Sequence, residues 1–204
     1  MSTRFAVLGL YNSGSTTLAG MLHRLGANMG APFWTDSEDD SPGNYYESHD
    51  LAWHLRNWWD EPYVEEKRSA AERRRYLRAW MELQESVGSQ PVGVKHPLLS
   101  LCTSDLMTAW GPGTVLIWSH RDLDASVAGL LRRGWYPGHA AAIQRRLWRA
   151  LTCAAEQFPE NLHRVCWESV KRDPAATARR LAGFAGLEPS AEQIRRAAGF
   201  VRQA

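Results

Sequence analysis

Short apolar runs alternate along the chain with longer segments whose apolar residues recur at helical spacing. Four runs predict buried strands, because each ends at a glycine, a proline or a polar stretch: residues 4–10, 91–94, 114–119 and 164–167. The other segments predict helices at residues 15–25, 49–59, 65–87, 122–133, 140–158 and 174–185, and a last helix from residue 190. Strands that alternate with helices indicate one α/β domain over residues 1–204, with three layers and a central parallel sheet flanked by helices.

Two helix boundaries are marked by capping residues. Asp173 precedes Pro174, which suits the first position of a helix, and Gly186 follows the last apolar position of that segment. Ser190 and Gln193 have the spacing of a capping box. We therefore expect these two helices to begin close to the predicted residues.

The composition is that of an ordinary folded domain, with 44% apolar and 23% charged residues in 204. No run approaches the ~20 apolar residues of a membrane span, and no secretory leader follows the start. The three cysteines show neither metal-ligand nor redox spacing: Cys102, Cys153 and Cys166. We expect reduced thiols, a cytoplasmic protein, no membrane span and no bound metal.

The charge is uneven although its sum is only +2. Residues 1–66 contain 3 basic and 10 acidic side chains, whereas residues 67–204 contain 21 basic and 12 acidic ones. The basic part either attracts an anionic ligand or consists of solvated arginine-rich helices. Only three of the basic residues are lysines, Lys67, Lys95 and Lys171, so each is a candidate for a task that arginine performs badly.

The stretch between the first strand and the first helix has the spacing of a phosphate-binding loop. Gly9 and Gly14 are followed by Ser15 and Thr16, with Ser15 where such a loop normally has lysine. Backbone N–H groups at a strand-to-helix turn suit a phosphate-like anion. The missing lysine disfavours an ATP-dependent kinase.

A phosphate loop without its lysine resembles that of the sulfotransferases that use 3′-phosphoadenosine 5′-phosphosulfate (PAPS) and release PAP. Residues 12–16 match that family's loop except at Asn12, where lysine or arginine is usual. The family's second signature, an arginine after a strand and a serine on the next helix, is similar to Arg121 and Ser126, although several members place the serine where this chain has Gly129. Residues 165–170 and 184–187 resemble later family segments, so the resemblance runs from about residue 5 to 190. It implies these cofactor-binding residues: Asn12, Ser13, Gly14, Ser15, Thr16, Thr17, Arg121 and Ser126.

The resemblance implies that a sulfuryl group moves from PAPS to a hydroxyl or amine acceptor, on a small molecule or a carbohydrate and not on a nucleic acid. Lys95 directly follows a predicted strand, so we expect it at the ligand edge of the sheet. Either its ammonium replaces the charge that Asn12 lacks, or the protein binds the cofactor and turns over slowly. His96 and Glu47 are rival general bases. Aromatic residues of the early part are candidates for an acceptor or adenine pocket, or for helix packing: Trp34, Tyr45, Tyr46, Trp53, Trp58 and Trp59.

Two other functions compete with sulfuryl transfer. The first is a nucleotide or small-molecule kinase with a phosphate-binding loop, which predicts binding of Mg-ATP. The second is a nucleotide-binding protein without catalysis, which the neutral side chain of Asn12 favours.

Overall fold

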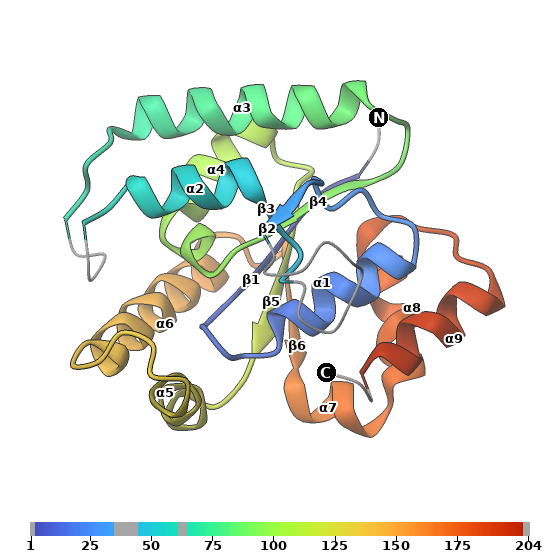
Figure 1. Cartoon of the computed structure of the whole chain (residues 1–204). Coiled ribbons are helices and arrows are strands. Elements are labelled where there is room, and N and C mark those ends of the chain that lie inside the picture. The colour runs from blue at the N-terminus through green and yellow to red at the C-terminus, as the bar shows by residue number, and fades with distance from the viewer. Residues whose placement is uncertain (1–2, 35–44, 61–64, 202–204) are drawn as a thin grey trace.

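The computed structural model describes residues 3–34, 45–60 and 65–201. Its centre is a sheet of four parallel strands in the order β4-β1-β5-β6 (Figure 1). These strands are β1 (Arg4–Gly9), β4 (Val92–Lys95), β5 (Val115–His120) and β6 (Leu162–Cys166). Each coincides within two residues with a predicted run, and the predicted α/β fold class is confirmed.

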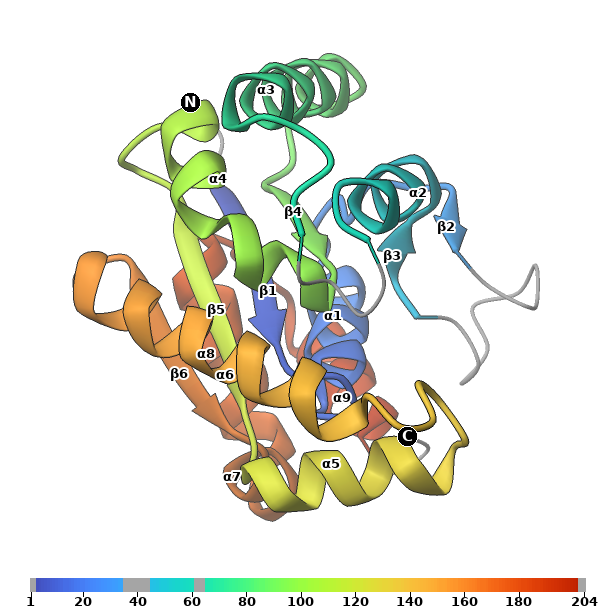
Figure 2. The same ribbon diagram turned by 90° about the vertical axis from the view of Figure 1, so that its left-hand side faces the viewer.

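Helices cover both faces of the sheet because every central strand is apolar on both sides. Phe5 and Val7 of β1 are fully buried in a cluster with residues of α1 (Ser15–Arg24), α8 (Pro174–Ala185) and α9 (Ala191–Phe200). Ala6 and Leu8 point the other way into a second cluster, as the two-residue period of a strand requires. Most of the helical residues in that cluster come from α2 (His49–Asn57), α3 (Ala70–Ser86), η1 (Pro97–Cys102), α4 (Thr103–Trp110) and α6 (Ala140–Gln157). Figure 2 shows α6 in front of the sheet and α8 behind it.

The strand ends bring distant residues to one edge. Val7 lies opposite Lys95, and Gly9 lies opposite Ser119, so the carboxyl ends of β1, β4 and β5 are neighbours. After β5 the chain enters α5 (Leu123–Arg132), and after β6 it enters α7 (Trp167–Arg172). This edge is where open α/β sheets bind their ligands.

The capped helices begin where the sequence predicts. Asp173 accepts a hydrogen bond from the N–H of Ala176, and Ser190 forms a complete capping box with Gln193. The start of α3 is different, because a capping box of Ser69 and Glu72 starts the helix at residue 70 instead of 65. The apolar pattern also predicts no element between residues 95 and 114, where η1 and α4 lie.

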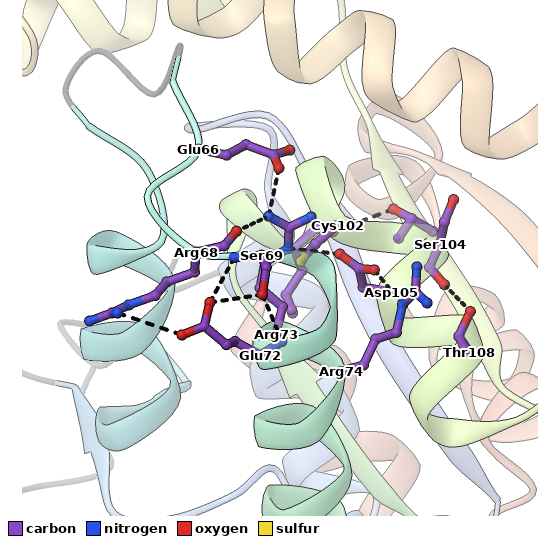
Figure 3. A network of polar contacts seen from close by, with 12 residues as sticks. Glu66, Arg68, Ser69, Glu72, Arg73, Arg74, Cys102, Ser104, Asp105 and Thr108 are labelled. Atoms are coloured by element: carbon purple, nitrogen blue, oxygen red, sulfur yellow. Dashed lines mark hydrogen bonds and ion pairs between the residues drawn. The ribbon is translucent and has the colours of Figure 1, made fainter.

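A network of ion pairs joins α3 to α4 (Figure 3). Asp105 is buried and accepts hydrogen bonds of 2.7 Å from both Arg73 and Arg74. The buried guanidinium of Arg73 also reaches Glu66 at 2.9 Å and the carbonyl of Arg68 at 2.7 Å. A buried charge with this many partners fixes one arrangement, since loss of a single partner costs ~3–5 kcal/mol. The network therefore fixes how α3 lies on α4.

A small antiparallel pair lies beside the parallel sheet. Its strands are β2 (Phe33–Trp34) and β3 (Glu47–Ser48), within or next to a stretch whose composition suggests a loop. Of that stretch, residues 35–44 fall outside the described residues. Strand β3 places Glu47 near the end of β4.

Candidate active site

The loop between β1 and α1 has a backbone that favours particular residues. Gly14 is the N-cap of α1 at φ 91°, and Asn12 lies at φ 59°, both in the left-handed region. The first N–H groups of α1 have no intrahelical acceptor, and no side chain of the described residues caps them. A β-carbon on Gly14 would overlap the ring of Trp167, which packs against the loop. This terminus offers backbone donors and a helix dipole to an anion.

Three side chains hold the carbonyl groups of the loop. The buried amide of Gln144 pairs with the backbone of Tyr11, accepting from its N–H at 3.1 Å and donating to its carbonyl at 2.7 Å. Ser119 donates to the carbonyl of Ser13 at 2.9 Å, and Arg121 donates to the carbonyl of Asn12 at 3.0 Å. The loop is thus tied to α6 and to the end of β5.

The two predicted phosphate contacts on β5 and α5 have different environments. Arg121 lines the cavity at the loop and forms no ion pair with any residue of the described ranges. Ser126 is fully buried, donates to the backbone carbonyl of Asp122 at 2.9 Å, and does not line the cavity. The helical backbone satisfies the Ser126 hydroxyl, and the structure does not bring it to the site. Nor does Ser13 line the cavity, and its Oγ is buried beneath the loop with no hydrogen-bond partner among the described residues.

Glu47, Lys95 and His96 form a buried cluster at the end of β4. Lys95 Nζ lies 2.5 Å from Glu47 Oε1, and His96 Nε2 lies 3.5 Å from Glu47 Oε2. The backbone N–H of Leu98 donates to His96 Nδ1 at 3.1 Å, so the proton of a neutral ring resides on Nε2 and faces Glu47. Both Glu47 and Lys95 line the cavity, whereas His96 does not.

Burial and charge decide the protonation of this cluster. Burial raises the pKa of Glu47, but the nearby charges of Lys95 and His96 and the hydrogen bond from Lys95 outweigh it, so the pKa is lowered overall. Burial also lowers the pKa of His96 to about 4, although the charge of Glu47 opposes this. At neutral pH Glu47 is therefore a carboxylate and His96 a neutral imidazole.

The loop, Arg121 and this cluster open into one cavity of about 740 Å³. Eight of the eleven predicted site residues line it: Asn12, Gly14, Ser15, Thr16, Thr17, Glu47, Lys95 and Arg121. The charged groups in the lining are four cations and one carboxylate: Arg56, Lys95, Arg121, Arg133 and Glu47. The cavity therefore suits an anionic ligand.

The aromatic residues divide between the cavity and the core. Trp34 and Tyr45 line the cavity, whereas Tyr46, Trp58 and Trp59 are buried in the two clusters and Trp53 is 53% exposed outside it. Further lining residues escaped the sequence analysis: Tyr11, Arg56, Arg133, Trp135, Tyr136, Trp167 and Phe200. Gln144 was also missed. It lies three positions before Leu147, beside the apolar stripe of its helix, and a polar residue at such a position indicates a buried hydrogen bond.

A larger hollow of about 940 Å³ lies along α8 and α9 and contains none of the predicted site residues. Within residues 3–34, 45–60 and 65–201, no group of three or more His, Cys, Asp or Glu side chains is arranged to hold a metal ion. Across the same ranges, no helix has both the length and the apolar character needed to cross a membrane.

Comparison with known proteins gives one family. The profile of a family described as the sulfotransferase family matches residues 5–191. None of the curated proteins matches the sequence.

Solved structures share the fold. Sulfotransferase STF9 from Mycobacterium avium is similar with a TM-score of 0.70 at 15% identity, over 98% of this chain and 68% of that one. Sulfotransferase STF1 from Mycobacterium tuberculosis H37Rv is similar with a TM-score of 0.63 at 16% identity, over 98% and 71%. The sulfotransferase domain from the curacin biosynthetic pathway gives 0.56 at 16% identity, over 95% and 77%.

Proposed function

The chain belongs to the sulfotransferase family and is a sulfotransferase, and we propose that its donor is PAPS, held between the loop at residues 12–17 and Arg121. The acceptor is a hydroxyl or amine compound that lies beside Glu47. The observation that carries this proposal is that three features meet in one cavity: the start of α1, which no side chain of the described residues caps, Arg121, which pairs with no carboxylate of those residues, and the pair of Lys95 and Glu47.

The residues present fit a ligand with two anionic ends. The first N–H groups of α1 suit the phosphosulfate end. Arg121 has one N–H group on the carbonyl of Asn12 and keeps its other donors for the 3′-phosphate. When bound, PAPS supplies the sulfuryl group, whose bond to the phosphate oxygen breaks as the acceptor atom bonds to sulfur, and PAP leaves.

Lys95 is proposed to stabilise the charge that develops on the transferred group. Its side chain is 3% exposed, and Glu47 is its only polar partner in the described part of the chain. An ammonium has three donors, so two remain for the cavity. A buried, fixed cation is worth more to a transition state than the same charge in water.

Glu47 is proposed as the general base, with His96 as the residue that positions it. Glu47 lines the cavity and is ionised at neutral pH because of its lowered pKa, so its carboxylate can accept the proton of the acceptor hydroxyl. His96 accepts a hydrogen bond from Leu98 with its Nδ1, its Nε2 lies 3.5 Å from Glu47 Oε2, and the residue does not line the cavity. These contacts support Glu47 over His96.

Binding of PAP without metal tests the proposal. In the presence of a chelator, PAP at ~100 times its dissociation constant should stabilise the protein by ~2.7 kcal/mol. The melting temperature is measured with PAP, with Mg-ATP and without ligand. Transfer of labelled sulfate from PAPS to a panel of hydroxyl and amine acceptors tests the chemistry. If millimolar PAP leaves the melting temperature unchanged and Mg-ATP raises it clearly, the result would contradict a PAPS site and favour a kinase site.

A further inference from the structure

Two arginine–tryptophan pairs line the cavity away from the loop. The guanidinium of Arg56 lies over the ring of Trp34 at 4.6 Å from its centroid. The guanidinium of Arg133 lies over the ring of Trp135 at 5.2 Å. All four residues line the cavity that contains Glu47 and Lys95.

Neither arginine has a carboxylate partner in the part of the chain that the structure describes. Within residues 3–34, 45–60 and 65–201, no ion pair or hydrogen bond involves Arg56 or Arg133, and their contacts are with the tryptophan rings. Glu47 is the carboxylate in the lining, and Lys95 already pairs with it at 2.5 Å. An aromatic ring holds a guanidinium in place but satisfies none of its five N–H donors.

These cations lie apart from the proposed phosphate contacts. Arg121 and Arg133 flank opposite ends of the ten-residue helix α5, which spans ~15 Å. Figure 2 shows α5 extending from the end of β5 toward the side on which β2, β3 and α2 lie. Arg56 belongs to α2 and lines the same cavity. Its charge is near enough to lower the pKa of both Glu47 and His96. The charge of Arg56 therefore acts at the proposed base.

The walls around these cations are aromatic. Tyr45 and Trp135 lie with ring centroids 6.2 Å apart, and Tyr11 and Tyr136 with centroids 5.5 Å apart. Rings of this kind bind the flat face of a ligand and leave its polar edge to neighbouring donors. A ligand here would meet aromatic faces and a guanidinium together.

We propose, on the basis of the proposed function, that this half of the cavity binds an acceptor that itself carries a negative charge on a ring-shaped body. Arg56 recognises the anionic group of the acceptor, the aromatic walls take its ring, and its hydroxyl lies beside Glu47. Arg133 is the second cation of this acceptor subsite. A guanidinium pairs well with a carboxylate or a sulfate, because two parallel N–H groups match two oxygens.

The test compares acids with neutral analogues of the same shape. The first pair is 4-hydroxyphenylacetate and 4-hydroxyphenylacetamide, and the second is phenyl β-D-glucuronide and phenyl β-D-glucoside. Dissociation constants are measured by calorimetry on the PAP-loaded and the PAP-free full chain. In at least one pair, the acid should bind about tenfold more tightly than its neutral analogue, because a charge-assisted hydrogen bond replaces a neutral one. The pair that shows this preference identifies an aromatic acid or an acidic sugar as the acceptor class.

Three variants locate the preference. Arg56→Gln should bring the acid-to-neutral ratio close to one without changing the affinity for PAP, and Arg133→Gln should reduce the ratio. The control Arg145→Gln changes an exposed arginine of α6 outside the cavity and should preserve the ratio.

Three results overturn the acceptor proposal: neither acid binds more tightly than its neutral analogue, the ratio survives Arg56→Gln, or Arg56→Gln weakens PAP instead. A titration with PAP alone tests the donor site separately. Failure of PAP to bind contradicts the proposed donor, whereas the PAP-free titrations still measure the acid preference.

Discussion

The side-chain amide of Asn12 occupies the space that a β-carbon on Gly129 would need, because a side chain at position 129 would overlap Asn12 Nδ2. Asn12 belongs to the loop and Gly129 to α5, so the contact joins two elements of the site. The resemblance to the PAPS-dependent sulfotransferases implies lysine or arginine at position 12 and, in several members, serine at position 129. The contact couples the two positions in this chain, because the amide of Asn12 lies where a side chain at position 129 would be.

Gly129→Ala should therefore destabilise the protein by ~1–3 kcal/mol, the usual cost of overpacking, and weaken PAP binding. Asn12→Gly removes the colliding amide and suits the left-handed backbone at φ 59°, so the double variant should recover most of the loss. The control is Gly183→Ala in α8, whose β-carbon meets nothing within 4 Å. Thermal unfolding with and without PAP is measured for the wild type, Gly129→Ala, the double variant and Gly183→Ala. A Gly129→Ala protein that melts and binds like the wild type would contradict the coupling.

Lys95→Met should abolish turnover while PAP affinity changes little, since the interaction of Lys95 with the transferred group is made mainly in the transition state. The same change leaves the buried carboxylate of Glu47 without its partner at 2.5 Å, which costs ~3–5 kcal/mol. Adding Glu47→Gln should restore part of the stability but none of the activity. Unfolding, PAP titration and sulfate transfer from labelled PAPS are compared for the three proteins. Near-normal turnover of Lys95→Met would remove Lys95 from the mechanism.

His96 should make the protein less stable as the pH falls from 7 to 5. Burial lowers its pKa from the ordinary 6.5 to about 4. The charge of Glu47 opposes this shift, whereas the charges of Lys95 and Arg56 add to it. Between these values the unfolded chain binds a proton that the folded chain does not, so the free energy of unfolding decreases as the pH falls. The loss attributable to His96 is about 2 kcal/mol between pH 7 and 5.

His96→Asn preserves an acceptor for the N–H of Leu98 and removes the titrating ring. Its free energy of unfolding, measured in urea at pH 7 and 5, should fall by about 2 kcal/mol less than that of the wild type. The other histidines with lowered pKa, His54 and His120, titrate in both proteins and cancel in the comparison. Equal losses in the two proteins would show that His96 does not titrate in this range.

Arg121→Ala should weaken PAP about tenfold or more, because a charge-assisted contact is lost, and should affect adenosine 5′-phosphosulfate less, because that compound lacks the 3′-phosphate. Ser119→Ala is the matched control, since it removes the other side-chain anchor at the end of β5 and leaves every cation in place. It should weaken the two ligands alike. Equal weakening by Arg121→Ala would show that Arg121 acts only through the carbonyl of Asn12.

Local physics explains which parts of the fold the sequence predicts. A short apolar run that ends at a glycine specifies β1 by itself, and Asp173, Pro174 and Gly186 specify the ends of α8, because caps act within a few residues. The loop at residues 12–17 is recognisable for the same reason. Where two local signals compete, as at residues 65 and 69, the apolar pattern extends α3 too far, and the capping box of Ser69 and Glu72 determines its start.

The chemistry of the site depends on contacts that no local pattern contains. Glu47 and Lys95 are 48 residues apart, and the pairing of β4 with β1 and the position of β3 bring them together. Their burial together then assigns the charges, with an ionised Glu47 and a neutral His96. The sequence by itself determined the order of strands and helices along the chain and the position of the loop, and it predicted that this loop binds an anion. Only the tertiary structure decided that Asn12 fits against Gly129 and that Arg56 lines the same cavity as Glu47 and Lys95, because each depends on which residues of distant segments become neighbours.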